Sequence, residues 1–194
     1  MPFGALWLPV VLSSVAMFLL GGVAWMVLPH HKKQWKRFPD ESAARLLLKA
    51  LPPGQYRIPY TTGPNPMKDP AFLARHGEGP VGTLALEKPG PMGMGRRLGL
   101  TFAVNFAIAF TTAYVLWLSL GWVHVGGLVA SPRDIFQIAA AVTFGFHVFA
   151  LFPEAIWFSK SWRRIGWEIV DAIVYAVVTG AIFTHCWPGT NHMS

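Results

Sequence analysis

Residues 143–179 read TFGFHVFALFPEAIWFSKSWRRIGWEIVDAIVYAVVT, and this stretch decides the expected fold. Two apolar runs flank a short basic turn at residues 160–164, a pattern typical of an antiparallel membrane hairpin. At about 100° per residue, each run carries its polar residues on one helical face. Counted outward from the turn, the two faces meet in three expected pairs: Glu154 with Asp171, His147 with Tyr175, and Thr143 with Thr179. Glu168 lies on the same face as Asp171.

The composition indicates a membrane protein. Of the 194 residues, 53% are hydrophobic and only 13% are charged, whereas soluble domains contain about 25% charged residues. Four runs reach the roughly 20 residues that a helix needs to cross a bilayer, namely residues 5–28, 98–120, 135–158 and 165–187. Hydrocarbon offers no hydrogen bonds to the backbone, so each run is expected to be helical. The sequence therefore predicts an all-α membrane protein with four transmembrane helices.

The basic residues predict the orientation. Twelve of the sixteen Lys and Arg residues lie within residues 30–97 and three lie in the turn, which leaves only Arg133 elsewhere. The positive-inside rule then places both basic segments in the cytoplasm and both termini outside. Basic side chains beside helix ends can meet anionic lipid headgroups, so the net charge of +7 does not imply nucleic acid. The expected headgroup contacts are Lys32, Lys33, Lys36, Arg37, Arg96, Arg97, Lys160, Arg163 and Arg164.

The first helix, residues 1–28, and the three-helix bundle, residues 98–194, are joined by a cytoplasmic loop region at residues 29–97. In this loop, residues 40–51 predict a short amphipathic helix that begins after Asp40 and stops at Pro52-Pro53. Residues 55–60 and 81–86 are strand candidates on either side of a helical turn at residues 69–76. A two-stranded hairpin is marginally stable alone. It would need support from the bundle or from a partner chain.

His30 and His31 follow the first span directly and precede Lys32-Lys33. Imidazole is a good ligand for transition metals. Adjacent side chains of a helix point in different directions, however, and the two lysines would repel a cation. We therefore expect no metal and no cofactor at this pair.

The other spans also carry polar and small residues at helical spacing. Asn105 lies in the second span at a depth similar to that of Glu154 and Asp171. In the last span, Ala172, Ala176 and Gly180 form a ridge that allows close helix approach. The candidate polar membrane cluster comprises Asn105, Thr143, His147, Glu154, Glu168, Asp171, Tyr175 and Thr179.

Several short segments resemble those of a family of bacterial multi-pass inner-membrane proteins to which no activity is assigned. These segments are residues 31–35 (HKKQW), 53–59 (PGQYRIP), 79–82 (GPVG), 156–158 (IWF) and 170–175 (VDAIVY). The resemblance is spread over most of the chain. It implies a location in the bacterial plasma membrane and no particular reaction.

Charged groups inside a bilayer are costly and normally face a partner. The cluster can therefore be a set of interhelical hydrogen bonds, or a proton or cation relay through His147, Glu154 and Asp171. A catalytic metal site is a further alternative, but the sequence contains no His-Glu-x-x-His motif. Our leading hypothesis is a non-enzymatic accessory or assembly subunit that contacts the lipid bilayer and other membrane subunits or further copies of itself. The alternative is a small proton-coupled or cation transporter.

Overall fold

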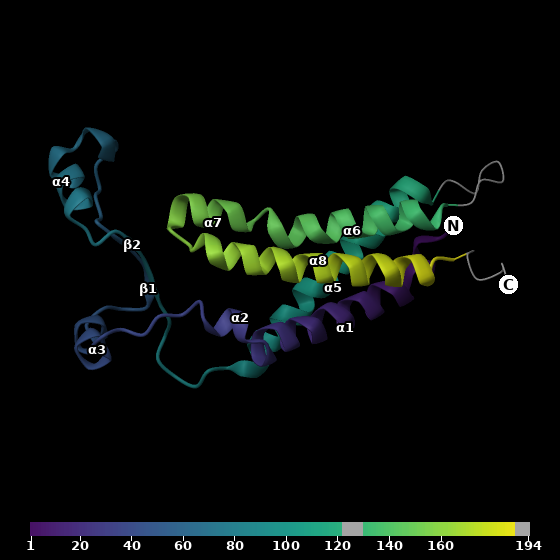
Figure 1. Ribbon diagram of the computed structural model, residues 1–194, viewed down its shortest axis with the longest axis horizontal. Coiled ribbons are helices and arrows are strands. Elements are labelled where there is room, and N and C mark those ends of the chain that lie inside the picture. Colours follow the sequence, from purple (N-terminus) through teal and green to yellow (C-terminus); the bar gives the residue numbers. More distant parts are fainter. Residues whose placement is uncertain (122–129, 189–194) are drawn as a thin grey trace. The chain divides into compact units, whose positions relative to one another are not determined.

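The computed structural model describes residues 1–121 and 130–188, and within them four helical segments are long and apolar enough to cross a membrane (Figure 1). The first comprises η1 (Phe3–Leu6), α1 (Trp7–Gly22) and a π-helical end, η2 (Val23–Val27). The second is α5 (Met94–Leu120), the third joins α6 (Pro132–Val148) to α7 (Leu151–Phe158), and the fourth is α8 (Trp162–His185). The predicted membrane fold is confirmed.

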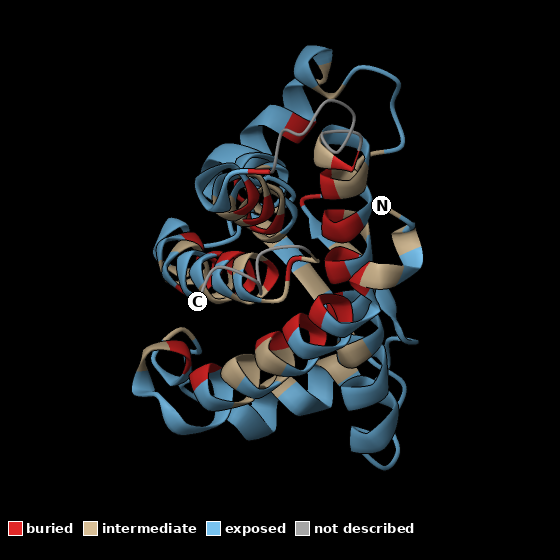
Figure 2. Cartoon of the chain, turned by 90° about the vertical axis from the view of Figure 1, so that its right-hand side faces the viewer, coloured by how far each residue is buried: buried red, intermediate tan, exposed pale blue. Residues whose placement is uncertain are grey.

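Four of these helices pack into one bundle. α1 packs against α5 and α8, α5 also contacts α6, and α6 lies along α8 (Figure 1). The first span therefore belongs to the same compact unit as α5, α6 and α8, and the described residues of this unit are 1–35, 93–121, 130–152 and 162–188. Its buried residues gather on the sides of the helices that face one another (Figure 2). The core includes Leu6, Met17, Ala113, Leu116, Ile135, Ala139 and Phe183.

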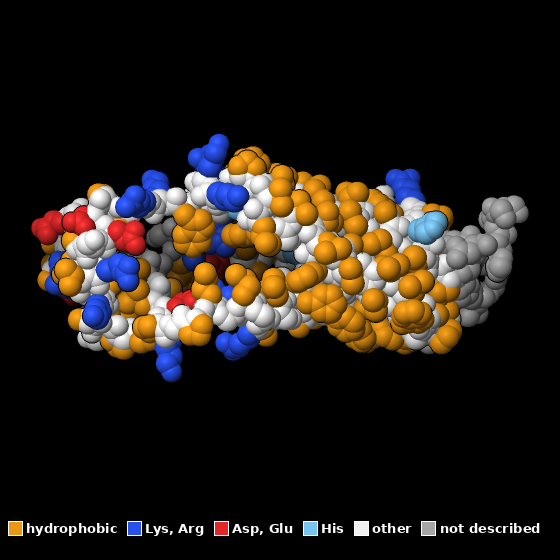
Figure 3. Space-filling view, turned by 90° about the horizontal axis from the view of Figure 1, so that it is seen from below, with side chains coloured by type: hydrophobic (Ala, Val, Ile, Leu, Met, Phe, Trp, Pro, Cys, Tyr) orange, Lys and Arg blue, Asp and Glu red, His pale blue; other side chains and the backbone are white. Residues whose placement is uncertain are grey.

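The outside of the bundle is apolar, as a lipid-facing surface requires. Hydrophobic side chains cover much of the helical surface that Figure 3 shows. Large exposed side chains occur on every span, among them Leu19, Val104, Phe146 and Ile173. In water such a surface would favour aggregation, whereas in a bilayer the lipid tails cover it.

Small residues allow α6 and α8 to approach closely. Ala172 is fully buried, and Ala176 and Gly180 are also buried on the same side of α8. A Cβ atom added at Gly180 would lie 2.9 Å from Cδ2 of Phe136 and 3.1 Å from its carbonyl oxygen. The second contact is with backbone and cannot be relieved by a side-chain rotation. The ridge expected from the sequence is therefore the surface on which α6 packs.

The third span is interrupted at Phe149 and Ala150, between α6 and α7. Pro153 explains the position of the break. Its ring excludes the helical hydrogen bond to residue 149 and clashes with the carbonyl group of that residue.

Residues 36–92, together with 153–161, form a second compact unit, here called the loop unit. It contains α3 (Glu41–Lys49), η3 (Pro66–Lys68) and α4 (Pro70–Glu78), and two antiparallel strands, β1 (Gly54–Ile58) and β2 (Gly82–Leu86). Asp40 caps α3 by accepting the amide of Ala43 at 2.9 Å, and Asp69 caps α4 in the same way. The predicted amphipathic helix and both predicted strands are confirmed.

The close contact at Gly180 yields a stability prediction. We expect Gly180→Leu to lower the thermal midpoint in mild detergent strongly, because the new side chain would push α8 away from Phe136, and overpacking costs about 1–3 kcal/mol or more. Val177→Leu is the matched control, because Val177 is 49% exposed on another side of α8. Equal midpoints for the two variants would contradict close packing at the ridge.

Candidate functional site

The first span ends in a sharp change of backbone direction that positions the candidate site. After the π-helical turn Val23–Val27, Leu28 is extended, with φ −74° and ψ 143°. Pro29 accounts for this, because the residue before a proline is disfavoured in the helical region. Pro29 then starts a new short helix, α2 (Pro29–Lys32), as the first residue of that helix. The break redirects His30 and His31 toward α8.

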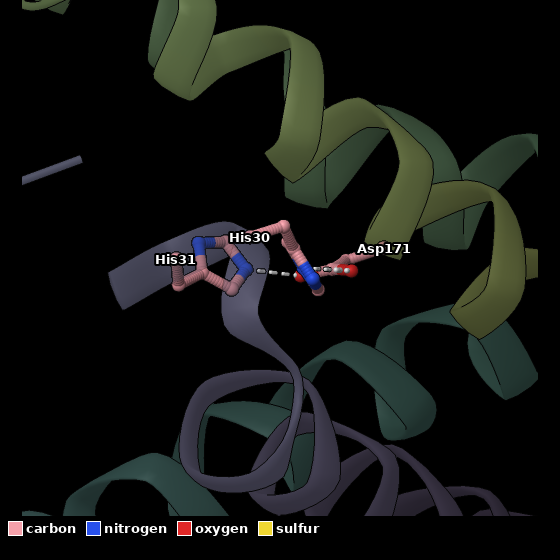
Figure 4. A group of neighbouring side chains, drawn as sticks. All are labelled: His30, His31 and Asp171. Carbon is pink, nitrogen blue, oxygen red and sulfur yellow. Dashed lines mark hydrogen bonds and ion pairs between the residues drawn. The ribbon is translucent and has the colours of Figure 1, made fainter. Parts of the chain in front are cut away.

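Both histidines lie beside Asp171 of α8 (Figure 4). Nε2 of His31 lies 2.6 Å from Oδ2 of Asp171, and Nε2 of His30 lies 3.4 Å from Oδ1. Each carboxylate oxygen therefore faces one imidazole ring. The side chains are 12%, 1% and 8% exposed for His30, His31 and Asp171, respectively, so the group is almost sealed from solvent.

Aromatic rings enclose the two histidines. Trp25 stacks on His31, with ring centroids 4.0 Å apart and planes inclined by 3°. Trp167 lies against His30 at 5.0 Å, and the two imidazoles are 4.2 Å apart. Packing on both sides holds the rings in place and leaves their nitrogens directed at the carboxylate.

Gln34 determines which nitrogen of His31 carries the proton. Its amide nitrogen lies 2.8 Å from Nδ1 of His31 and donates to it. The ring proton is then on Nε2, which donates to Oδ2 of Asp171. Nε2 of His30 differs from that of His31. It is buried and lies 3.4 Å from Oδ1 of Asp171, but it makes no hydrogen bond. A buried ring nitrogen without a hydrogen bond is unusual and needs a reason.

The polar residues expected from the sequence have separate partners. His147 donates from Nδ1 to the carbonyl group of Thr143 at 2.8 Å, and its ring lies 5.0 Å from that of Tyr175, which confirms this expected pair. Thr143 is fully buried, with its hydroxyl 3.4 Å from that of Thr112 on α5. Thr179 and Asn105 are buried in the bundle as well.

The acidic residues of the predicted cluster do not share one site. Glu154 is 53% exposed and pairs with Lys160 at 3.7 Å, and Glu168 pairs with Arg164 at 3.4 Å within α8. Asp171 bonds to His31 instead of the expected Glu154. The hydrogen bonds and ion pairs of His147, Glu154 and Asp171 therefore go to different partners, and none joins two of these three residues.

Sequence reasoning missed His30 and His31 as partners of Asp171. The assumption that adjacent histidines point apart is wrong here, because α2 has a single turn and its backbone approaches α8 closely enough for both rings to reach one carboxylate. One signal was available. Asp171 lies nine residues inside α8, too deep to reach the basic turn, so a buried partner was required from another segment.

Eight of the nine basic residues predicted to meet lipid headgroups are exposed, and Arg164 is half-buried beside Glu168. Lys32 and Lys33 are among the exposed ones.

Comparisons of the chain with family models, with curated proteins and with solved structures find no match.

The buried position of the His31–Asp171 contact predicts a large effect of losing it. We expect Asp171→Ala to destabilise the purified protein by about 1–3 kcal/mol, the cost of leaving a buried donor such as His31 unsatisfied. Glu168→Ala is the control, since its partly exposed pair with Arg164 is worth about 0–1 kcal/mol. Chemical denaturation in detergent measures both. A smaller loss for Asp171→Ala than for Glu168→Ala would mean that the contact does not hold α2 on α8.

Proposed function

We propose that this chain is a non-enzymatic accessory or assembly subunit of a larger complex in a bacterial inner membrane, with both termini outside and residues 36–92 of the loop unit in the cytoplasm. The observation that carries the proposal is the near absence of a core in the loop unit. Among residues 36–92, only Pro59 and Phe72 are buried. So few buried side chains provide little hydrophobic free energy to offset the loss of chain entropy on folding.

The α3 helix shows what the loop unit leaves uncovered. Glu41, Arg45 and Lys49 lie one turn apart along a charged side. Leu46 and Leu47 lie on the other side and are 75% and 77% exposed. An apolar helix face of this kind is typically covered by a membrane surface or by a protein groove.

The adjacent hairpin favours a protein over lipid. β1 and β2 pair only with each other, and within the described residues no third strand covers either outer edge. An uncovered edge presents backbone N–H and C=O groups. A partner protein can satisfy these groups by adding a strand, whereas lipid tails cannot. We therefore assign the loop unit to contact with another protein subunit.

The proposal predicts that the native particle contains a second kind of polypeptide. Extracted from native membranes in mild detergent, the chain should appear in native mass spectrometry with a second polypeptide in fixed ratio. In the double variant Leu46→Ser/Leu47→Ser, the chain should lose the second polypeptide and appear as a monomer or a homo-oligomer. Arg45→Gln, on the charged side of α3, should leave the complex intact. A wild-type particle that contains only this chain would contradict the proposal.

Amide hydrogen exchange separates a protein partner from lipid in the same experiment. We expect β1 and β2 to be protected in native membranes and to exchange rapidly when the purified chain is placed in vesicles of pure lipid. Equal protection in both would mean that lipid alone covers the loop unit. Rapid exchange in both would mean that nothing covers it.

A proton-coupled or cation transporter is the second candidate. It is favoured by the hydroxyl groups of Ser13 and Thr179, which are buried in the bundle without a hydrogen bond, as expected where water enters. It is weakened by the separate partners of His147, Glu154 and Asp171.

Flux measurements in vesicles distinguish the two candidates. A relay needs a titrating group, so the transporter requires a pH- or cation-dependent flux that Asp171→Asn abolishes without unfolding the protein. We expect no such flux from the isolated wild-type chain. A robust flux that is lost in Asp171→Asn would favour the transporter over the accessory subunit.

A further inference from the structure

We propose that His30, His31 and Asp171 form a binding site for one divalent transition-metal ion of the Zn²⁺ type. The site is a property of the bundle. It does not depend on the partner protein assigned to the loop unit.

The donor atoms of the three side chains are close enough to share an ion. One nitrogen from each histidine and one carboxylate oxygen lie within 4.8 Å of one another. Ligands about 2.0–2.1 Å from a tetrahedral Zn²⁺ are roughly 3.3 Å apart. The distance from Nε2 of His30 to Oδ1 of Asp171, 3.4 Å, already has this value. The 2.6 Å hydrogen bond between His31 and Asp171 has to open, and donor atoms that now lie up to 4.8 Å apart have to come to the same spacing.

The unbonded nitrogen of His30 is the second observation that points to a ligand. Nε2 of His30 is buried, faces the carboxylate and makes no hydrogen bond. A metal ion between the rings would use its lone pair. This would account for a nitrogen that is otherwise buried without compensation.

Gln34 supplies the outer contact that metal-binding histidines normally have. A ligating histidine donates the proton on its other nitrogen to an oxygen acceptor. Half a turn of the Gln34 amide brings its carbonyl oxygen to Nδ1 of His31, in place of the nitrogen now 2.8 Å away. Nδ1 then carries the proton and Nε2 is free to bind the ion. The same side chain thus serves both the metal-free and the metal-bound forms.

The charge and type of the ligands define the class of ion. Two neutral imidazoles and one carboxylate suit zinc and its first-row neighbours, whereas Mg²⁺ and Ca²⁺ prefer all-oxygen sites. A divalent cation would also neutralise the buried carboxylate. No other His, Cys, Asp or Glu among the described residues joins the group, so a fourth position is open to water or another ligand.

An ion would reach the site past His30. His30 is the most exposed of the three at 12%, and the exposed Lys32 and Lys33 follow in sequence. Asp171 lies nine residues into α8, or about 13 Å from the start of that helix at 1.5 Å per residue. A bound ion would therefore lie inside the bundle, about this far along α8 from its first residue.

Metal titration of the full chain tests the site. After chelator treatment in detergent, we expect the wild-type protein to bind one equivalent of Zn²⁺ by calorimetry, and Co²⁺ to give the visible absorption of a tetrahedral nitrogen and oxygen site. Zn²⁺ should also raise the thermal midpoint, since a ligand that binds only the folded state stabilises it.

His30→Ala is the decisive variant, because its Nε2 makes no hydrogen bond and its loss should leave the metal-free fold intact. We expect it to weaken Zn²⁺ binding by more than the roughly 10- to 100-fold that loss of an outer contact causes, and Gln34→Ala to weaken it within that range. His185→Ala, at an exposed histidine at the end of α8, is the control and should bind as the wild type does.

Two results would overturn the proposal. The first is the absence of stoichiometric Zn²⁺ binding and of a tetrahedral Co²⁺ spectrum in the wild-type chain, which would leave the cluster as hydrogen bonds alone. The second is binding that survives both His30→Ala and Asp171→Asn, which would place the ion on other histidines. If His30→Ala fails to fold, the wild-type Co²⁺ spectrum and the response of Gln34→Ala still decide between these outcomes.

Discussion

The carboxylate of Asp171 lies inside an apolar bundle, and its contacts with His30 and His31 join α8 to the segment that follows the first span. A charged group at mid-bilayer costs about 2.5–3.5 kcal/mol on insertion scales, so it is retained only where other groups compensate. Here His31, beyond the end of the first span, supplies a hydrogen bond at 2.6 Å, and the ring of His30 lies beside the same carboxylate at 3.4 Å. The contact fixes α2 against α8 and with it the last turn of the first membrane helix. Trp25 and Trp167 then close the space around the rings.

The bundle and the loop unit differ in how their apolar side chains are covered. In the bundle, small residues such as Gly180 bring the helices together, while the large apolar side chains face outward to lipid. The loop unit has neither arrangement. Its charged and apolar residues separate clearly on α3, yet Leu46 and Leu47 are left uncovered by the chain itself. The same polypeptide thus contains a well-packed helical bundle and a second unit with few buried side chains.

Much of the fold could be predicted from the sequence, because it depends on local patterns. Hydrophobic length gives the four spans, and Asp40 followed by a stripe of leucines and alanines gives α3. The pairing of His147 with Tyr175 follows from counting residues outward from one turn, as both sides of a hairpin share that turn. Each of these inferences needs only neighbours in sequence or a short connection.

The centre of the candidate site could not be predicted in this way. Its geometry depends on the π-helical winding of Val23–Val27 and on the extended Leu28, which together set the direction in which His30 and His31 leave the first span. Periodicity assumes a regular helix and places adjacent side chains about 100° apart, so it separates the two rings. The break before Pro29 is visible in the sequence, but the helix it faces is not.

The His31–Asp171 contact also affects the order of biosynthesis, because 140 residues separate its two partners. His31 leaves the ribosome well before Asp171, which belongs to the fourth span of the described residues. Until that span arrives, the imidazoles have no carboxylate and the end of the first span has no fixed direction. The contact between α2 and α8 therefore forms only after this fourth span has been made. A chain truncated before α8 would lack the carboxylate for both histidines, and this distinguishes an unfinished bundle from a complete one.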